Sequence, residues 1–254
     1  MDREKNSYDS LAEHYDVLER DGEKITKKIN DFLGSVFKKH SVKAVLDVSC
    51  GTGAQAIGLV KEGYKVTACD YSEAMLDIAR KKAMGLGLSF AKKDMRSSSY
   101  GQFDAVIAIF NVVAHVDKED FKKTLKNVWS NLKNEGIFVF DIISLEGLKS
   151  DQSVRRWYID TMAENKGVKY VRFTKECLDK NNNLLKVSHK TYVQKPSEQL
   201  KKLKESWELQ LYPMAELKQL VKSAGFEILN IYDENGKDFG NNTAESAYFV
   251  LKKS

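Results

Sequence analysis

The stretch VLDVSCGTGAQAIGL (residues 45–59) passes from β-branched residues into a turn with two glycines, Gly51 and Gly53, and then into alanine-rich sequence. A strand, a glycine turn and a helix in this order are typical of the first unit of an open parallel sheet, which binds ligands at the carboxyl ends of its strands. A glycine lets the backbone approach a ligand closely, and the following helix presents free N–H groups to negative charge. The stretch therefore predicts a cofactor site at the turn.

The sequence on both sides of this stretch alternates between strand and helix patterns. Strands are expected at residues 43–49, 65–70, 88–92, 103–109 and 136–143, and helices at 23–39, 53–62, 72–84 and 118–133. Such alternation indicates a parallel sheet covered by helices.

After residue 150 the pattern changes to long β-rich segments, at 155–162, 168–178, 184–194 and 200–211, with a turn at 179–183. A helix at 214–224 and strands at 226–233 and 245–252 follow. The predicted fold class is therefore α/β, a doubly wound, seven-stranded, mostly parallel sheet with an inserted antiparallel β-sheet. We divide the chain into a core with an N-terminal helical lid (1–143), the insertion (144–212) and a C-terminal part that completes the core sheet (213–254).

Composition narrows the class of protein. The chain has 254 residues, 42% hydrophobic, and no apolar run near the roughly 20 residues that span a bilayer. The polar N-terminus lacks the apolar stretch of a secretory signal, so we expect a cytoplasmic protein without a membrane partner. Three dispersed cysteines without a CxxC pair predict neither disulfides nor a metal site. Four histidines are present, and of these His14, His40 and His189 are expected at the surface.

The glycine turn alone fits two cofactors. Residues 51–56 also satisfy the GxGxx[G/A] pattern of dinucleotide-binding proteins, and Asp70, 19 residues after Gly51, suits the ribose of either cofactor. Four segments together distinguish them: LDVSCGTG (46–53), VTACDYSEAMLDIAR (66–80), AKKDM (91–95) and FDAVIAIFNVVAHV (103–116). In this order and spacing they resemble the class I S-adenosylmethionine-dependent methyltransferases.

The resemblance implies S-adenosylmethionine as cofactor, S-adenosylhomocysteine as product, and a set of cofactor-binding residues. Asp70 suits the two ribose hydroxyls, and Asp94 suits the exocyclic amine of adenine. Asp47 supports the glycine loop and is a candidate contact for the methionine amine. The full predicted set is Tyr8, Asp47, Ser49, Gly51, Gly53, Asp70, Tyr71, Met75, Asp94, Met95, Ile109 and His115.

Within that superfamily, IFNVVAHV (109–116), LKNVWSNLKNEGIFVFD (125–141) and WELQLYPMAELKQLVKSAGF (207–226) resemble the glycine N-methyltransferase branch and related small-amine N-methyltransferases. Sugar-amine N,N-dimethyltransferases are similar too. The resemblance implies that the insertion covers the acceptor site and that the acceptor atom is an amine nitrogen. The family's carboxylate-holding arginine is missing after the fifth strand, where the chain reads FDIISL (140–145), and Arg155, Arg156 and Arg172 are candidate replacements.

The segment SYDSLAEHYDVL (7–18) resembles the part of these enzymes that closes over the methyl donor. Tyr8 and Tyr15 lie seven residues apart, so both fall on one face of a helix. Asn111, Tyr15 and His115 are the predicted catalytic residues, with His115 either contacting the cofactor tail or acting as a base. The predicted acceptor-binding residues are Asn111, Arg155, Tyr158, Arg172 and Tyr212, with Tyr170 as a further candidate.

The main alternative is a tRNA or rRNA methyltransferase. Residues 144–211 hold 14 Lys/Arg against 9 Asp/Glu, and such a basic segment suits phosphate. Against it, the two prolines exclude a [DN]PP[YF] motif, and no cysteine follows the fourth strand. A nicotinamide-dependent oxidoreductase and a non-catalytic cofactor-binding protein are the other classes considered. A homo-oligomer is compatible with the sequence.

Overall fold

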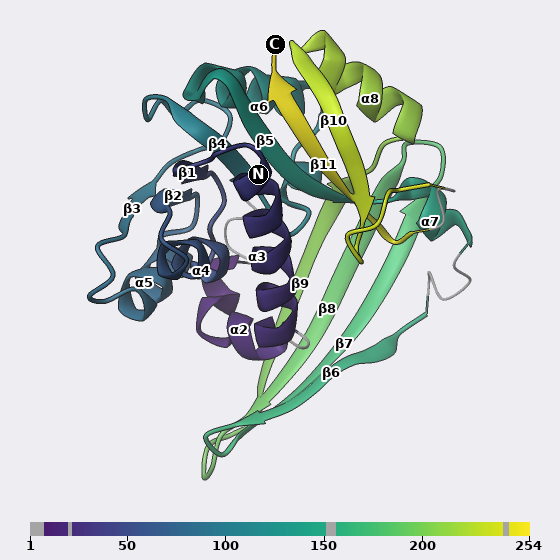
Figure 1. Cartoon of the computed structure of the whole chain (residues 1–254). Helices are drawn as coiled ribbons and strands as arrows, with labels where there is room; N and C mark the ends of the chain where they lie inside the picture. The colour runs from purple at the N-terminus through teal and green to yellow at the C-terminus, as the bar shows by residue number, and fades with distance from the viewer. Residues whose placement is uncertain (1–7, 20–21, 151–155, 241–243) are drawn as a thin grey trace.

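A computed structural model of the chain describes residues 8–19, 22–150, 156–240 and 244–254. Two sheets make up its frame (Figure 1). The first has seven strands in the order β10-β11-β5-β4-β1-β2-β3, and the second has four in the order β6-β7-β8-β9. The predicted fold class is confirmed.

The seven-stranded sheet is built by the alternation that the sequence shows. Its strands are β1 (Ala44–Asp47), β2 (Lys65–Asp70), β3 (Ser89–Lys92), β4 (Phe103–Ala108), β5 (Leu132–Ile143), β10 (Phe226–Asp233) and β11 (Ser246–Lys253). Only β11 runs antiparallel to its neighbours, β5 and β10. The chain leaves β1 toward β2 and β3, and later pairs β4 with the other side of β1. The strand order therefore reverses between β1 and β4, where ligands bind in such sheets.

Helices cover both faces of this sheet, because each presents an apolar stripe to it. Among the described residues the helices include α2 (Tyr15–Leu18), α3 (Gly22–Lys39), α4 (Ala54–Lys61), α5 (Glu73–Lys82), α6 (Lys118–Asn131), α7 (Leu145–Ser150) and α8 (Met214–Ser223), with short 3-10 helices at Ala12–His14 and Val112–His115. Leu33 and Phe37 of α3 pack with Val45 and Ile107 on one face. Phe121 of α6 and Leu217 of α8 pack with Phe138 on the other.

The helix expected at 118–133 ends two residues early, at Asn131, and β5 begins directly after it. The cause is that Leu132 is fully buried and pairs with Phe103 of β4, so the strand starts before the residues that look like one in the sequence.

The second sheet comprises β6 (Tyr158–Asn165), β7 (Val168–Asp179), β8 (Leu184–Gln194) and β9 (Lys201–Gln210), all antiparallel. Its long strands extend beyond the seven-stranded sheet, and α2 lies against them (Figure 1). Alternate residues of these strands are buried, so one face is turned inward. His14 and His189 are only 4% and 8% exposed, so the expectation that both lie at the surface is wrong. Each packs at an inward face, His14 against Tyr170 and His189 against Trp207.

None of the described helices is both long and apolar enough to span a membrane.

Candidate active site

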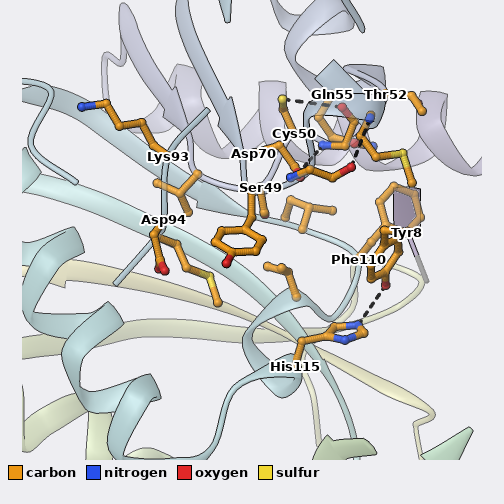
Figure 2. Close-up of a pocket in the computed structure, with 18 of the residues that line it drawn as sticks. Tyr8, Ser49, Cys50, Thr52, Gln55, Asp70, Lys93, Asp94, Phe110 and His115 are labelled. Carbon is orange, nitrogen blue, oxygen red and sulfur yellow. Dashed lines mark hydrogen bonds between the residues drawn. The ribbon is translucent and has the colours of Figure 1, made fainter. Parts of the chain in front are cut away.

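A pocket opens at the carboxyl ends of β1, β2, β3 and β4, beside the point where the strand order reverses (Figure 2). In the view of Figure 2, Ser49, Cys50 and Asp70 lie on one side of it and His115 on the other. The residues around it come from the glycine turn, the strand ends, the loop after β4 and the N-terminal segment. They are Tyr8, Tyr15, Val48, Ser49, Cys50, Gly51, Thr52, Ala54, Gln55, Asp70, Tyr71, Ser72, Met75, Lys93, Asp94, Met95, Arg96, Ile109, Phe110, Val112, His115 and Val116.

The two glycines of the turn have different roles. Both have a left-handed backbone, with φ of 51° at Gly51 and 86° at Gly53. Gly51 lines the pocket, and a Cβ there would meet no atom within 4 Å, whereas a Cβ at Gly53 would lie 3.2 Å from the Cβ of Ala79. Gly51 thus leaves room for a ligand, and Gly53 lets α4 start close to α5. The structure does not place Gly53 at the pocket surface.

Asp70 is fixed at the end of β2 by the backbone of two loops. Its Oδ2 accepts a hydrogen bond from the Gly51 N–H (2.8 Å), and its Oδ1 accepts one from the Ser72 N–H (2.9 Å). Burial raises the pKa of this carboxyl above its usual value, while the backbone donors oppose the shift. A carboxylate has about four acceptor sites, so Asp70 keeps acceptor capacity for a ligand in the pocket.

Asp47 lies behind the turn rather than in the pocket wall. It is 2% exposed, and its Oδ1 accepts a hydrogen bond from the Ser49 N–H (3.2 Å). Burial raises its pKa to about 7. Asp47 therefore holds the backbone on which Ser49 and Gly51 reach the pocket.

The part of the pocket beyond Asp70 is mainly apolar, with Tyr71, Met75, Met95 and Ile109 as its walls. Asp94 lies at its rim, and Arg96 pairs with it through Nε and Nη2 (2.5 Å for Nη2). Arg96 also contacts Asp120 at the start of α6. Arg96 lowers the pKa of the Asp94 carboxyl, so this side chain stays an anion held in one orientation.

The N-terminal segment closes one end of the pocket. Tyr8 and Tyr15 both line it, with ring centroids 6.4 Å apart, and the Tyr8 hydroxyl lies 3.2 Å from Nε2 of His115. The segment is tied to the glycine turn by a hydrogen bond from Thr52 Oγ1 to Asp16 (2.6 Å), and to the end of β2 by one from Ser72 Oγ to Asp9 (2.5 Å). These contacts make residues 8–19 a lid over the pocket.

Three buried polar atoms of the pocket have no hydrogen-bond partner among the described residues. They are Ser49 Oγ, Gln55 Nε2 and His115 Nδ1. An unpaired buried polar atom costs free energy, so such atoms mark positions where a bound polar molecule completes the hydrogen bonding. A molecule with a polar amino-acid end, a ribose and a flat ring matches this arrangement of unpaired atoms, Asp70 and apolar walls.

Most of the predicted cofactor-binding residues meet in this pocket, but the predicted acceptor-binding residues do not. Tyr158 is 39% exposed on the edge strand β6, and Tyr212 is buried against Phe121. Arg172 is buried and pairs with Asp160 and Glu19. Arg155 lies outside the described residues, Arg156 is exposed, and Tyr170 packs against the lid.

Asn111 also turns away from the pocket. Its Oδ1 accepts a hydrogen bond from the Ile143 N–H (2.9 Å), and its own N–H donates to Asp141 (3.1 Å). With a φ of 57°, Asn111 lets the chain turn sharply after β4 and ties that turn to β5. Its neighbours Phe110 and Val112 line the pocket instead.

Arg96, Phe110 and Gln55 line the pocket but are not among the site residues predicted from the sequence. Arg96 follows Asp94 by two residues, a spacing at which a side chain can fold back on the carboxylate. Gln55 is the second residue of α4, and its position directly after the glycine turn could have indicated that it lies at the pocket. Phe110 has a φ of 67°, which its sequence does not indicate.

Residues 45–136 match a family described as "Methyltransferase domain". The matched segment carries the glycine turn, Asp70 and Asp94, which are the residues around which the pocket is built. This match, together with the relatives described next, supports a class I S-adenosylmethionine-dependent methyltransferase.

Two curated proteins and one solved structure illustrate its relatives. It is 27% identical over 215 residues to "Putative methyltransferase YqeM" of Bacillus subtilis (strain 168), covering 83% of this chain and 84% of that protein. It is 37% identical over 117 residues to a glycine/sarcosine N-methyltransferase of Parasynechococcus marenigrum (strain WH8102), covering 44% and 42%. A S-adenosylmethionine-dependent methyltransferase from Clostridium acetobutylicum ATCC 824 has the same fold, with a TM-score of 0.77, 24% identity and coverage of 89% and 91%.

Proposed function

We propose that this methyltransferase transfers the methyl group of S-adenosylmethionine to the nitrogen of a small-molecule amine. The observation that carries the proposal is the likeness to a glycine/sarcosine N-methyltransferase, which spans less than half of either chain. The lid supports it, because residues 8–19 close over the end of the pocket where Tyr8, Tyr15 and His115 meet. A closed pocket suits a small acceptor.

The cofactor's sugar and amino-acid end are assigned to the glycine turn and the end of β2. Asp70 would accept hydrogen bonds from both ribose hydroxyls with the lone pairs that Gly51 and Ser72 leave unused. Ser49 Oγ and Gln55 Nε2 would bind the polar amino-acid end, since both residues line the pocket and neither atom has a hydrogen-bond partner among the described residues. Gly51 keeps this region free of a side chain.

The adenine is assigned to the apolar part of the pocket. Met75 and Ile109 are 2% and 4% exposed, so they serve the protein core and the pocket wall at once. Met95 and Tyr71 complete the wall, and the Asp94 carboxylate, oriented by Arg96, would accept a hydrogen bond from the exocyclic amine. S-adenosylmethionine supplies a methyl group already activated by a sulfonium.

The chain's own contribution to the reaction is positioning and exclusion of water. A neutral amine attacks an activated methyl carbon in line, which needs orientation and desolvation more than a strong base. Burial lowers the pKa of His115 to about 4, so its imidazole is uncharged at neutral pH. Burial also raises the pKa of Tyr15 well above its usual value, so Tyr15 stays a neutral phenol. Both groups suit hydrogen bonding to the reactants rather than proton removal from an ammonium.

The basic insertion does not favour a nucleic-acid acceptor. Strand alternation places Lys186, Lys190 and Lys204 on the face of the four-stranded sheet opposite to the inward residues His189 and Glu205. A phosphate backbone bound by these lysines would lie on the outer face, away from the lid and the pocket.

The test has two stages. Calorimetric titration with S-adenosylhomocysteine should give a measurable heat of binding with the purified protein. Release of S-adenosylhomocysteine from S-adenosylmethionine is then followed with glycine, sarcosine, ethanolamine and D-glucosamine as acceptors, and with bulk tRNA as the rival. Release that depends on one of the amines supports the proposal. Release with tRNA alone would overturn it.

A further inference from the structure

A band of polar side chains crosses the inward face of the four-stranded sheet. Thr174, His189 and Glu205 lie side by side on β7, β8 and β9, since Thr174 pairs with His189 and His189 with Glu205. The next inward row contains Arg172 and Thr191. On one side of the band Tyr170 and Val193 pack against the lid, and on the other Leu185 and Leu209 pack into the main core.

Glu205 is the residue of this band that the fold leaves unsatisfied. It is 4% exposed, and neither carboxylate oxygen has a hydrogen-bond partner among the described residues. Thr191 is fully buried beside it, and its hydroxyl is also unpaired in the described part of the chain. Burying an unpaired carboxylate is among the costlier features a folded protein can carry, so its retention indicates a ligand.

The nearby guanidinium does not supply the missing partner. Arg172 donates from Nε to Asp160 (2.5 Å) and pairs with Glu19 of the lid at 3.4 Å. His189 is uncharged at neutral pH, because burial lowers its pKa to about 4, and its Nδ1 lies 3.1 Å from Thr174 Oγ1. Around the band three carboxylates, of Glu19, Asp160 and Glu205, therefore face one guanidinium. Burial raises the pKa of Glu19 and raises that of Glu205 to about 7, so a bound cation is favoured because it stabilises the ionised form of both carboxyls.

An aromatic stack connects the band to the pocket. The His189 ring stacks on Trp207, with centroids 4.9 Å apart, and Trp207 stacks on Tyr8 at 5.6 Å. Tyr8 lines the pocket and contacts His115. Both stacking contacts of Trp207 are with side chains of the protein, so the stack links the band to the pocket, and the Glu205 carboxylate is the group that would bind an ammonium ion.

We propose that Glu205 is the acceptor-recognition residue, binding an ammonium group of the incoming amine next to Trp207, on the lid side of the cofactor pocket. The inference rests on the proposed function and adds the chemical class of the acceptor, an amine that arrives as a cation. Glu205 binds the acceptor as an ammonium and takes up its proton. The neutral nitrogen then bonds to the methyl carbon at the pocket end beside Tyr8 as the carbon–sulfur bond breaks.

The test compares Glu205→Gln with Glu208→Gln. Glu208 lies on the same strand, faces outward and pairs with Lys186 at 4.0 Å, so its variant makes the same chemical change on the opposite face. For each variant we measure the melting temperature, the affinity for S-adenosylhomocysteine by calorimetry, and kcat/KM for the most active of glycine, sarcosine, ethanolamine and D-glucosamine.

Glu205→Gln should melt about 2–4 °C higher than the wild type, because an unpaired buried charge is removed. Its affinity for S-adenosylhomocysteine should stay within about twofold, while kcat/KM for the amine falls about tenfold or more, the loss expected for a charge-assisted hydrogen bond. Glu208→Gln should match the wild type in all three.

Two results would overturn the inference while leaving the proposed function intact. One is a Glu205→Gln enzyme with wild-type kcat/KM for the amine, and the other is a variant that melts lower than the wild type, as a purely structural residue would. If the wild type binds S-adenosylhomocysteine but methylates none of the four amines, the amine assignment fails, and the ammonium ligand with it.

Discussion

The edge of the seven-stranded sheet and the inward face of the four-stranded sheet both bury carboxylates, but the two regions differ in the hydrogen bonds that these carboxylates accept. Asp47, Asp70 and Asp141 each accept hydrogen bonds from backbone N–H groups of the loops beside them. Glu205 accepts none among the described residues. At the first place the fold itself holds the charged groups in position before a ligand arrives. At the second the fold leaves a charge without a partner, so ligand binding and stability are opposed there.

Replacing Asp70 gives the largest effect expected at the sheet edge. Asp70→Ala removes both acceptors proposed for the ribose and leaves the Gly51 and Ser72 N–H groups without their partner. We expect the affinity for S-adenosylhomocysteine to fall by about 100-fold or more, or about 2.7 kcal/mol. Calorimetric titration measures this directly.

The matched control is Asp77→Ala, which removes an exposed carboxylate from α5, where it pairs with Arg80 at 2.9 Å. It should bind S-adenosylhomocysteine as the wild type does. Circular dichroism of Asp70→Ala establishes that the variant is folded. Wild-type affinity in a folded Asp70→Ala protein would remove the basis for assigning the ribose to this edge.

Variants of Asn111 test whether this residue at the end of β4 contributes to methyl transfer or to the stability of the fold. Asn111→Ala loses the hydrogen bond from Ile143 and places alanine at a φ of 57°, so we expect a loss of about 2 kcal/mol in the free energy of unfolding. Asn111→Gly keeps the backbone freedom and should lose about 1 kcal/mol. Urea denaturation measures both.

The affinity of both Asn111 variants for S-adenosylhomocysteine should stay within about twofold, because the side chain turns away from the pocket. If Asn111→Ala kept wild-type stability and lost turnover instead, the direct catalytic role expected from the sequence would be restored.

Asp70 and Asn111 show which parts of the site can be predicted from the sequence. Gly51 and Asp70 were found because a parallel strand delivers the residues at its end to one edge of the sheet, whatever the rest of the chain does. Asn111 also follows a strand, yet its side chain bonds to β5, 32 residues later in the chain. Tyr212 and Arg172 were misplaced for the same reason, since their burial depends on α6 and the lid.

Glu205 was missed although the sequence carried a signal. In KKLKESWELQ (201–210) Leu203, Trp207 and Leu209 share the phase of Glu205, so strand alternation already places this glutamate on the apolar face. A charged residue in a buried phase is the informative exception that composition alone hides.

The pH dependence of stability sharpens the contrast between the two regions. Burial raises the pKa of Glu205 to about 7, against 4.5 when exposed, and Arg172 only partly opposes this. The folded protein therefore holds the Glu205 proton more tightly than the unfolded chain, so this group favours folding most at low pH, and the benefit is lost as the pH rises from 4.5 through 7.

The difference in free energy of unfolding between Glu205→Gln and the wild type should therefore grow by up to about 1.4 kcal/mol per pH unit between about pH 5 and 7, and level off above. Asp47 and Asp141, with pKa values raised to about 7 and about 6, are present in both proteins and cancel in the difference. Denaturation at a series of pH values tests this, with Glu208→Gln as the control that makes the same substitution on the outward face. A constant difference would mean that Glu205 has the same pKa in the folded and unfolded chain.

The lid gives the smallest expected effect, because the variant tested there removes one hydrogen bond and one partly exposed ion pair. Asp16→Ala removes the hydrogen bond from Thr52 Oγ1 and the ion pair with Lys82 (2.9 Å), which is partly exposed and contributes little by itself. The hydrogen bond to Thr52 contributes about 1 kcal/mol, so the affinity for S-adenosylhomocysteine should weaken about fivefold. Asp31→Ala removes an exposed ion pair with Lys27 on α3, and neither residue lines the pocket, so this variant should have no effect. If the two variants bound equally well, closure of the lid would not depend on its contact with the turn, and the Glu19 and Leu18 contacts to Arg172 and Thr161 would have to hold the lid from the four-stranded sheet alone.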